Sequence, residues 1–249
     1  MDKDLYDTLI QHGHTQARVR SVLLGLNWSV CRADGVGVCF SPTDPPRTLP
    51  WSGTLVNRRT DELASWLRSF DPVEATVGAL VVNACVNHAD NALLRRAQPL
   101  SLAAPAHLQV FAHFAPWVRG ASVAVVGRYP GLEALWQGIS YQCLERRPGP
   151  GVLPDTAAEY VLPRVDWVFL TASAIANKTL PRLLALSRQA RVVLMGPSLP
   201  WLEEWADWGV DYLAGVAVTD EEALIQTAAE AGGTRIFETG VGYRLASLG

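Results

Sequence analysis

Small polar residues follow two apolar runs in the middle of the chain, and these positions are the ones best suited to hold a ligand. The runs at 166–171 and 191–195 predict buried strands, and each ends in small or hydroxyl-bearing residues. In an open α/β sheet, ligands bind in the crevice outside the carboxyl ends of the strands. The sequence therefore predicts a small-molecule site in these loops. Its candidate contacts are Thr171, Ser173, Asn177, Thr179, Gly196, Pro197 and Ser198.

Both loops precede predicted helices, which suggests what chemistry they could perform. A helix N-terminus presents free N–H groups and the positive end of a dipole, so either loop could hold a carboxylate or phosphate. Asn177, Thr179 and Ser198 are also ordinary helix-capping residue types, and capping is the structural alternative for each loop.

A third candidate loop lies where a dinucleotide-binding fold would place its phosphate loop. The run 122–127 predicts a strand, but Gly127 and Gly131 alone do not make the G-x-G-x-x-G pattern. Glu145 follows Gly127 by 18 residues, where such folds place the acid that binds a ribose hydroxyl. If Glu145 has that role, the loop could bind a nucleoside-type ligand without the pyrophosphate contacts of a dinucleotide. An exposed acid at a strand end is the alternative.

Asn83 and Asn87 lie four residues apart on an apolar helix and therefore share one face. Buried amides need hydrogen-bond partners, so the two side chains either bond loops of the second domain or line a cleft between domains and contact the ligand. The neighbouring His88 is a metal-ligand candidate, although a single histidine at a helix end is more often structural. His107 and His113 are six residues apart, which places them on different faces of a helix and disfavours a shared metal site.

No catalytic group can be assigned. The chain contains no G-x-S-x-G, H-E-x-x-H or Walker pattern, which disfavours the common hydrolase and phosphotransferase mechanisms. Glu145, Asp155 and Glu159 are the carboxylates nearest the predicted site, and each could equally be an exposed end of a helix or strand. Enzymatic turnover therefore stays open.

Composition narrows the class of protein. The 249 residues are 49% hydrophobic and 18% charged, with a formal net charge of −3, and the basic residues are scattered, so no nucleic-acid partner is expected. No apolar run is long enough to cross a membrane, and the first ten residues carry acids where a signal peptide carries bases. A cytoplasmic location is expected. The four cysteines show no disulfide or zinc-site spacing.

The elements that position these residues divide into two predicted domains. Residues 1–97 read as an α+β unit, with helices over 5–26 and 73–88, the first turn of a short helix capped by Thr60, and a hairpin turning at Asp34–Gly35. Residues 97–105 are the best linker candidate. Residues 105–249 alternate strand and helix patterns, which predicts a doubly wound parallel sheet. The expected strands are 122–127, 139–145, 166–171, 191–195, 211–214 and 235–238, and the expected helices are 131–137, 155–162, 179–188, 199–208 and 220–231.

Several segments carry a family resemblance. DTAAEYVLP (155–163), DWVFLTASAIANKTL (166–180) and VLMGPSLP (193–200) resemble the family described as putative heavy-metal chelation, as do GLNW (25–28) and VNACVN (82–87). The resemblance implies an enolase-N-terminal-like α+β domain followed by a Rossmann-like domain, with a site between them. It also implies work on chelators, flavins or pterins in a metal-related setting. The chain has Thr171-Ala172 where similar sequences often have Thr-Gly. The positions that match family motifs are Asn83, Asn87, Gly127, Thr171, Asn177, Thr179, Gly196, Pro197 and Ser198.

Three hypotheses follow. The first is a small-molecule-binding protein or enzyme of metal homeostasis, with its site in the interdomain cleft and a divalent or transition metal complex, or a nucleoside-type molecule, as ligand. The second is a non-enzymatic metal or metal-complex carrier with His88, His107, His113 and a cysteine as ligands. The third is an interaction module, for example a homodimer, that uses a stripe of Trp201, Trp205 and Trp208, and it requires that stripe to be exposed.

Overall fold

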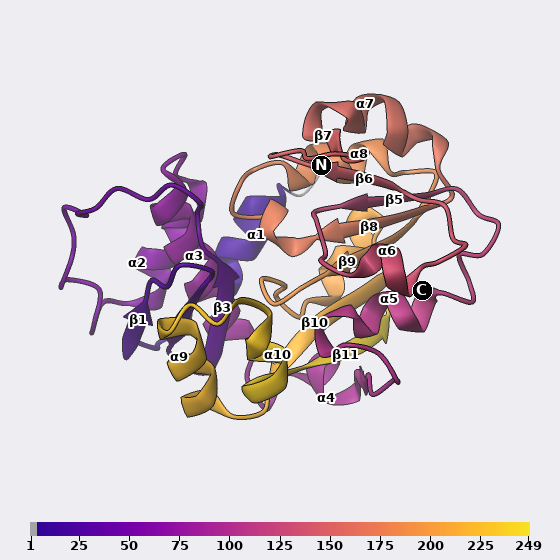
Figure 1. Cartoon of the computed structure of the whole chain (residues 1–249). Coiled ribbons are helices and arrows are strands. Elements are labelled where there is room, and N and C mark those ends of the chain that lie inside the picture. The colour runs from indigo at the N-terminus through magenta and orange to yellow at the C-terminus, as the bar shows by residue number, and fades with distance from the viewer. Residues whose placement is uncertain (1–3) are drawn as a thin grey trace.

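The computed structural model describes residues 4–249 and shows two lobes in contact (Figure 1). The N-terminal lobe packs a three-stranded antiparallel sheet, in the order β1-β2-β3, against helix α3. Its elements are α1 (Leu5–His12), β1 (Ser21–Leu23), β2 (Trp28–Arg32), β3 (Val36–Phe40), α2 (Thr60–Ala64), the 3₁₀ helix η1 (Ser65–Arg68), α3 (Pro72–Val86) and α4 (Ala92–Arg96).

Local signals explain the hairpin and α3. The strands β2 and β3 pair across the turn with Trp28 opposite Phe40, as expected from the Asp-Gly turn. The Asp71 carboxylate accepts the N–H groups of Val73 and Glu74, and Pro72 occupies the first turn of α3, where its missing N–H has no cost. A glycine at position 37 lets β3 approach α3, because a Cβ there would lie 2.0 Å from a backbone carbonyl of that helix.

Two predictions for this lobe are wrong. The helix expected over 5–26 ends at His12, because the following residues are extended and bond to other segments. Val19 exchanges backbone hydrogen bonds with the loop before α2, and β1 pairs with β2. Thr60 is the first residue of α2 instead of its cap, and its hydroxyl contacts that of Thr15 at 3.1 Å.

The second lobe contains an eight-stranded sheet in the order β4-β11-β10-β9-β8-β5-β6-β7. The six strands from β5 to β10 run parallel, and β11 is antiparallel to both of its neighbours. The strands are β4 (Gln98–Pro99), β5 (Val123–Val126), β6 (Gln142–Glu145), β7 (Leu153–Pro154), β8 (Trp167–Thr171), β9 (Arg191–Met195), β10 (Tyr212–Val218) and β11 (Val241–Ser247).

Short helices connect these strands. They are α5 (Gln109–Phe114), α6 (Leu132–Leu135), α7 (Ala158–Val161), α8 (Leu180–Leu186), α9 (Glu221–Ala229) and α10 (Ile236–Thr239). The 3₁₀ helices are η2 (Ala106–Leu108), η3 (Asp155–Ala157), η4 (Leu162–Arg164), η5 (Ala172–Ala174), η6 (Glu203–Trp208) and η7 (Gly233–Arg235). The predicted mixed α/β architecture with a parallel-rich sheet is confirmed.

Three details of this lobe differ from expectation. The expected strand over 235–238 is helical instead, because residue 235 ends η7 and residues 236–238 belong to α10. The last strand is β11, the long antiparallel partner of β10. The helix expected over 199–208 is confined to η6, since residues 199–202 are held extended by side chains of the N-terminal lobe. The proposed linker contributes β4, which pairs with β11.

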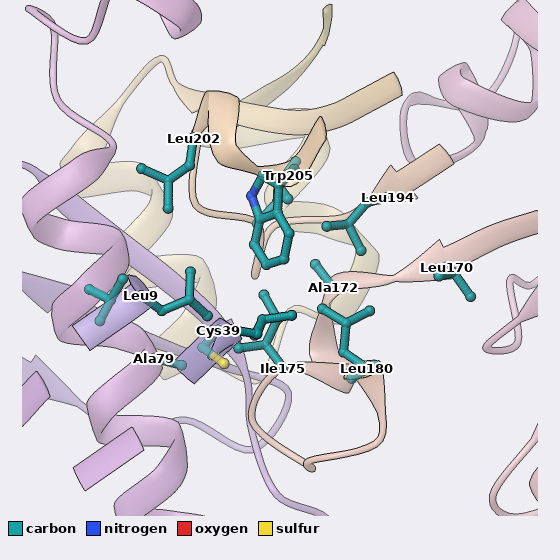
Figure 2. Close-up of a cluster of buried hydrophobic side chains, with 14 of the residues drawn as sticks. Leu9, Cys39, Ala79, Leu170, Ala172, Ile175, Leu180, Leu194, Leu202 and Trp205 are labelled. Carbon is teal, nitrogen blue, oxygen red and sulfur yellow. The ribbon is translucent and has the colours of Figure 1, made fainter. Parts of the chain in front are cut away.

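One hydrophobic core continues through both lobes. Figure 2 shows Leu9, Cys39 and Ala79 of the N-terminal lobe facing Ile175 and Trp205 of the second lobe, and all five side chains are buried. The tryptophan stripe is part of this core, because Trp201 and Trp205 are 1% and 0% exposed. These two tryptophans are therefore packing residues, and they do not form the exposed surface that the interaction-module hypothesis requires.

Candidate functional site

A cavity of about 930 Å³ lies where the two lobes meet, above the carboxyl ends of the parallel strands. The hairpin and the loop after β3 supply one wall, and the strand-end loops of the second lobe supply the opposite wall. The ligand contacts predicted from the sequence that line it are Gly127, Glu145, Thr171, Ser173, Asn177, Thr179, Gly196, Pro197 and Ser198. The carboxylates Asp155 and Glu159 and the metal-ligand candidate His107 line it as well.

Gly127 and Thr171 lie side by side in the cavity lining. Gly127 follows β5 and Thr171 ends β8, and these neighbouring strands have onward connections that leave in opposite directions, which is the switch point where open sheets bind ligands. Gly127 has φ +105°, and a Cβ on it would lie 3.3 Å from Cγ2 of Thr171. The Thr171 hydroxyl lies 2.9 Å from that of Ser173. The following Ala172 points into the shared core, so its methyl group does not narrow the cavity.

Glu145 connects two of the strand-end loops. Its Oε2 accepts the backbone N–H of Arg128 at 3.0 Å, and its Oε1 accepts that of Arg146 at 2.7 Å. Both carboxylate oxygens are therefore used to hold the loops that follow β5 and β6.

The loop before α8 is held by its own side chains. The Asn177 Oδ1 accepts the backbone N–H of Thr179 at 3.1 Å and its hydroxyl at 2.6 Å. Between them Lys178 has φ +70°, and its ammonium bonds the carbonyl of Leu67 and lies 4.9 Å from the ring centroid of Tyr6. Burial lowers the pKa of Lys178 to about 8. The ammonium thus joins the two lobes at the edge of the cavity.

The loop after β9 is buried and combines an open backbone with a contact between lobes. Gly196 has φ +113°, and a Cβ there would meet no atom within 4 Å, so a ligand can approach this backbone closely. Pro197 is buried beside it. The Ser198 hydroxyl accepts the backbone N–H of Phe40 at 2.9 Å and so joins the loop to β3.

Asn83 and Asn87 lie outside the cavity lining. Asn83 Nδ2 donates to the carbonyl of Val38 at 2.9 Å within its own lobe. Asn87 Nδ2 donates to the carbonyl of Leu199 at 3.0 Å, and its Oδ1 accepts the N–H of Trp201 at 3.0 Å. Of the two interpretations offered by the sequence, the contacts of Asn87 match the one in which the amide bonds a loop of the second lobe.

Sequence reasoning missed two groups of lining residues. The first group is aromatic and comprises Trp28, Phe40, Tyr129, Phe237 and Tyr243, which come from both lobes. The second group is cationic and comprises Arg128, Arg146, Arg147 and Arg182. The adjacent Arg146 and Arg147 directly follow Glu145 and could have been recognised there. The aromatic group is assembled from distant segments and leaves no local signal.

Metal-ligating side chains are dispersed in this structure. Within residues 4–249, no group of three or more His, Cys, Asp and Glu side chains is arranged to hold a metal ion. His107 Nε2 lies 3.0 Å from the carbonyl of Pro130, and burial lowers the pKa of His113. Burial raises the pKa of Cys31 to about 12 and that of Cys39 to about 11, so both are protonated thiols, which are poor ligands. In the same described part of the chain, no helix is both long and apolar enough to cross a membrane.

Comparisons with known proteins point to one family. A family model described as putative heavy-metal chelation, DUF364, matches residues 109–247, and a second model with the same description, DUF4213, matches residues 6–86. A crystal structure of a DUF364 protein of unknown function from Desulfitobacterium hafniense is 30% identical, with a TM-score of 0.86, over 98% of this chain and 97% of that one.

A second crystal structure of a DUF364 protein of unknown function, from Pyrococcus horikoshii, is 19% identical, with a TM-score of 0.76, over 97% of each chain, and supports the fold. No curated protein matches the sequence.

Proposed function

This chain belongs to the DUF364 family, described as putative heavy-metal chelation, and we propose that its cavity binds a metal as a complex with a small organic chelator. The family description supports a metal-related function. The observation that carries the finer proposal is the cavity itself, which has the volume of a small-molecule site and lies at the switch point of the sheet.

The side chains around the cavity favour a complex over a bare ion. A transition metal bound by protein alone needs several imidazole, thiolate or carboxylate ligands at one point. In the described residues no such group is assembled. A chelator would supply those ligands, and the protein would then need to recognise only the organic molecule through hydroxyl, backbone and charged groups.

Calorimetric titration tests this proposal with two exposed threonines changed to tryptophan. Thr156 lines the cavity, so Thr156→Trp would fill part of it, whereas Thr219 is exposed outside the lining and Thr219→Trp is the matched control. The probes are Ni²⁺ alone, pyridine-2,6-dicarboxylate alone, and their complex. We expect the complex to bind most tightly. We also expect Thr156→Trp to weaken that binding by about tenfold or more, which is about 1.4 kcal/mol, and Thr219→Trp to leave it unchanged.

Other results would contradict the proposal. Tight binding of Ni²⁺ alone, equal in both variants, would overturn it and favour a carrier that holds the ion with its own side chains. Absence of binding by the complex would also overturn it. Binding of the complex that is insensitive to Thr156→Trp would place the ligand elsewhere.

A further inference from the structure

The two ends of the cavity differ in chemistry, and we propose that its ligand is an elongated molecule with a flat aromatic ring at one end and a multiply charged acidic group at the other. The inference rests on the proposed function for the location of the site. It adds the class of ligand and the direction in which the ligand lies.

The length of the cavity follows from the strands beneath it. Residues at or just after the ends of β6, β5, β8 and β9 all line it, and these four strands are consecutive neighbours in the sheet. Three interstrand spacings of about 4.8 Å give a length of about 14 Å. A ligand that fills the cavity therefore reaches across chemically different walls.

The aromatic end is formed where the hairpin meets α10 and β11. The Trp28 ring packs edge-to-face against Phe40, with centroids 5.3 Å apart, and against Phe237 at 6.5 Å. Phe237 in turn stacks on Tyr243 at 4.9 Å. Phe40 is still 39% exposed although it lines the cavity, so aromatic surface is available to a ligand. An aromatic ring bound here would add area burial and ring-to-ring contacts.

The cationic end lies over β6, η3 and α8. Arg146 is 3.6 Å from a carboxylate oxygen of Asp155, and Arg182 donates to the Glu159 carboxylate at 2.8 Å through Nε. Arg147 pairs with the carboxylate of Asp44, which belongs to the loop after β3 in the other lobe.

All three of these arginines are more than half exposed, and exposed ion pairs of this kind contribute little to stability. A carboxylate or phosphate of the ligand could therefore replace the protein carboxylates at little cost, with bidentate hydrogen bonds as compensation.

The ligand is expected to lie in the cavity in the direction opposite to that of a nucleoside in a typical dinucleotide-binding fold. There the acid that ends the second strand accepts hydrogen bonds from ribose. Here Glu145 stands at that position, but its oxygens already accept backbone N–H groups, and the next two residues are arginines. The acidic group of the ligand is thus expected at the β6 end and its ring at the hairpin.

Three matched probes separate the two ends. AMP carries a ring and a phosphate dianion on one molecule, adenosine has the ring alone, and ribose 5-phosphate has the dianion alone. We expect AMP to bind about tenfold or more tightly than either of the others in calorimetric titration. Added salt should weaken the binding of AMP and leave that of adenosine unchanged, because only AMP contacts the arginines.

Substitutions assign each end. Arg182→Gln should weaken AMP binding about tenfold, as expected for loss of a charged hydrogen bond, without changing adenosine binding. Phe237→Leu should weaken both AMP and adenosine and leave ribose 5-phosphate unchanged. Arg95→Gln, an exposed arginine of α4 outside the cavity, is the matched control and should change nothing.

The inference is overturned if AMP does not bind at millimolar concentration, if AMP and adenosine bind equally, or if Arg182→Gln and Arg95→Gln behave alike. The proposed function has its own readout in the metal complex and Thr156→Trp. A complex that binds in the cavity while the AMP series fails would therefore refute the ligand class and leave the proposed function intact.

Discussion

The Asn87 side chain should make two of the main hydrogen bonds that hold the second lobe against the first. The loss in the free energy of unfolding on its removal can be calculated. Its amide makes two hydrogen bonds to the segment before η6, one to the Leu199 carbonyl and one from the Trp201 N–H, each 3.0 Å long. Leu199 and Trp201 are each only 1% exposed. Asn87→Ala would leave both backbone groups without this partner. At about 1 to 1.5 kcal/mol for each, the free energy of unfolding should fall by about 2 to 3 kcal/mol.

Urea denaturation followed by circular dichroism measures this loss directly. For a chain of this size, the corresponding fall in melting temperature is about 5 to 10 °C. Asn177→Ala is the matched control, because the exposed Asn177 side chain bonds to Thr179 in its own loop, so the free energy of unfolding should fall by less than about 1 kcal/mol. A loss below about 0.5 kcal/mol for Asn87→Ala would refute the reasoning, since it would show that water replaces the amide without cost.

Three further predictions concern packing and titration. Gly37→Ala should destabilise the protein by more than about 3 kcal/mol or prevent folding, because its Cβ would overlap the α3 backbone. Gly53→Ala should cost only about 1 kcal/mol, because its Cβ would meet no atom within 4 Å and only its φ of +78° is unfavourable. Soluble yield and melting temperature distinguish the two variants. Cys31 and Cys39 should resist iodoacetamide at pH 8 in the native protein and react after unfolding, as read by mass spectrometry; rapid native alkylation would contradict their burial and raised pKa values. The pKa of Lys178 in the folded protein, about 8, lies below its ordinary 10.5, so the folded protein loses this proton at a lower pH than the unfolded chain. The stability of the wild type should therefore rise relative to that of Lys178→Met between pH 8 and 10.5. A difference in urea midpoint that stays constant over this range would contradict the prediction.

Elements with strong local signals could be predicted from the sequence. The turn at Asp34–Gly35 depends on a few adjacent residues, and it is confirmed. The helix expected over 73–88 is also confirmed, because α3 spans Pro72–Val86 and begins at the Asp71 cap. The long helix expected over 5–26 fails because its apolar spacing reflects packing in an extended segment that bonds to distant loops. The last strand was misplaced for a similar reason, since β11 is specified by its pairing with β10 and β4.

The candidate site likewise combines residues that could be predicted from the sequence with residues that only tertiary packing brings together. Gly127, Thr171 and the loop after β9 could be placed because the ends of parallel strands converge in any fold of this kind. The aromatic wall could not be predicted, because Trp28 and Phe237 meet only after the hairpin docks against α10. The hydrogen-bond partners of Asn87 could not be predicted either, because they depend on which loop of the second lobe packs against it. The sequence is compatible with both interpretations of this side chain.

The placement of β11 between β10 and β4 determines when the cavity comes into existence during synthesis. β4 leaves the ribosome soon after the N-terminal lobe, yet the strand with which it pairs, β11, follows more than 140 residues later. Until β11 emerges, the edge of β10 stays open, and an open strand edge invites pairing with other chains. Tyr243 of β11 also lines the cavity, so the cavity is incomplete until β11 has been synthesised and has paired with β10. The proposed ligand would therefore bind chains in which β11 is already in place.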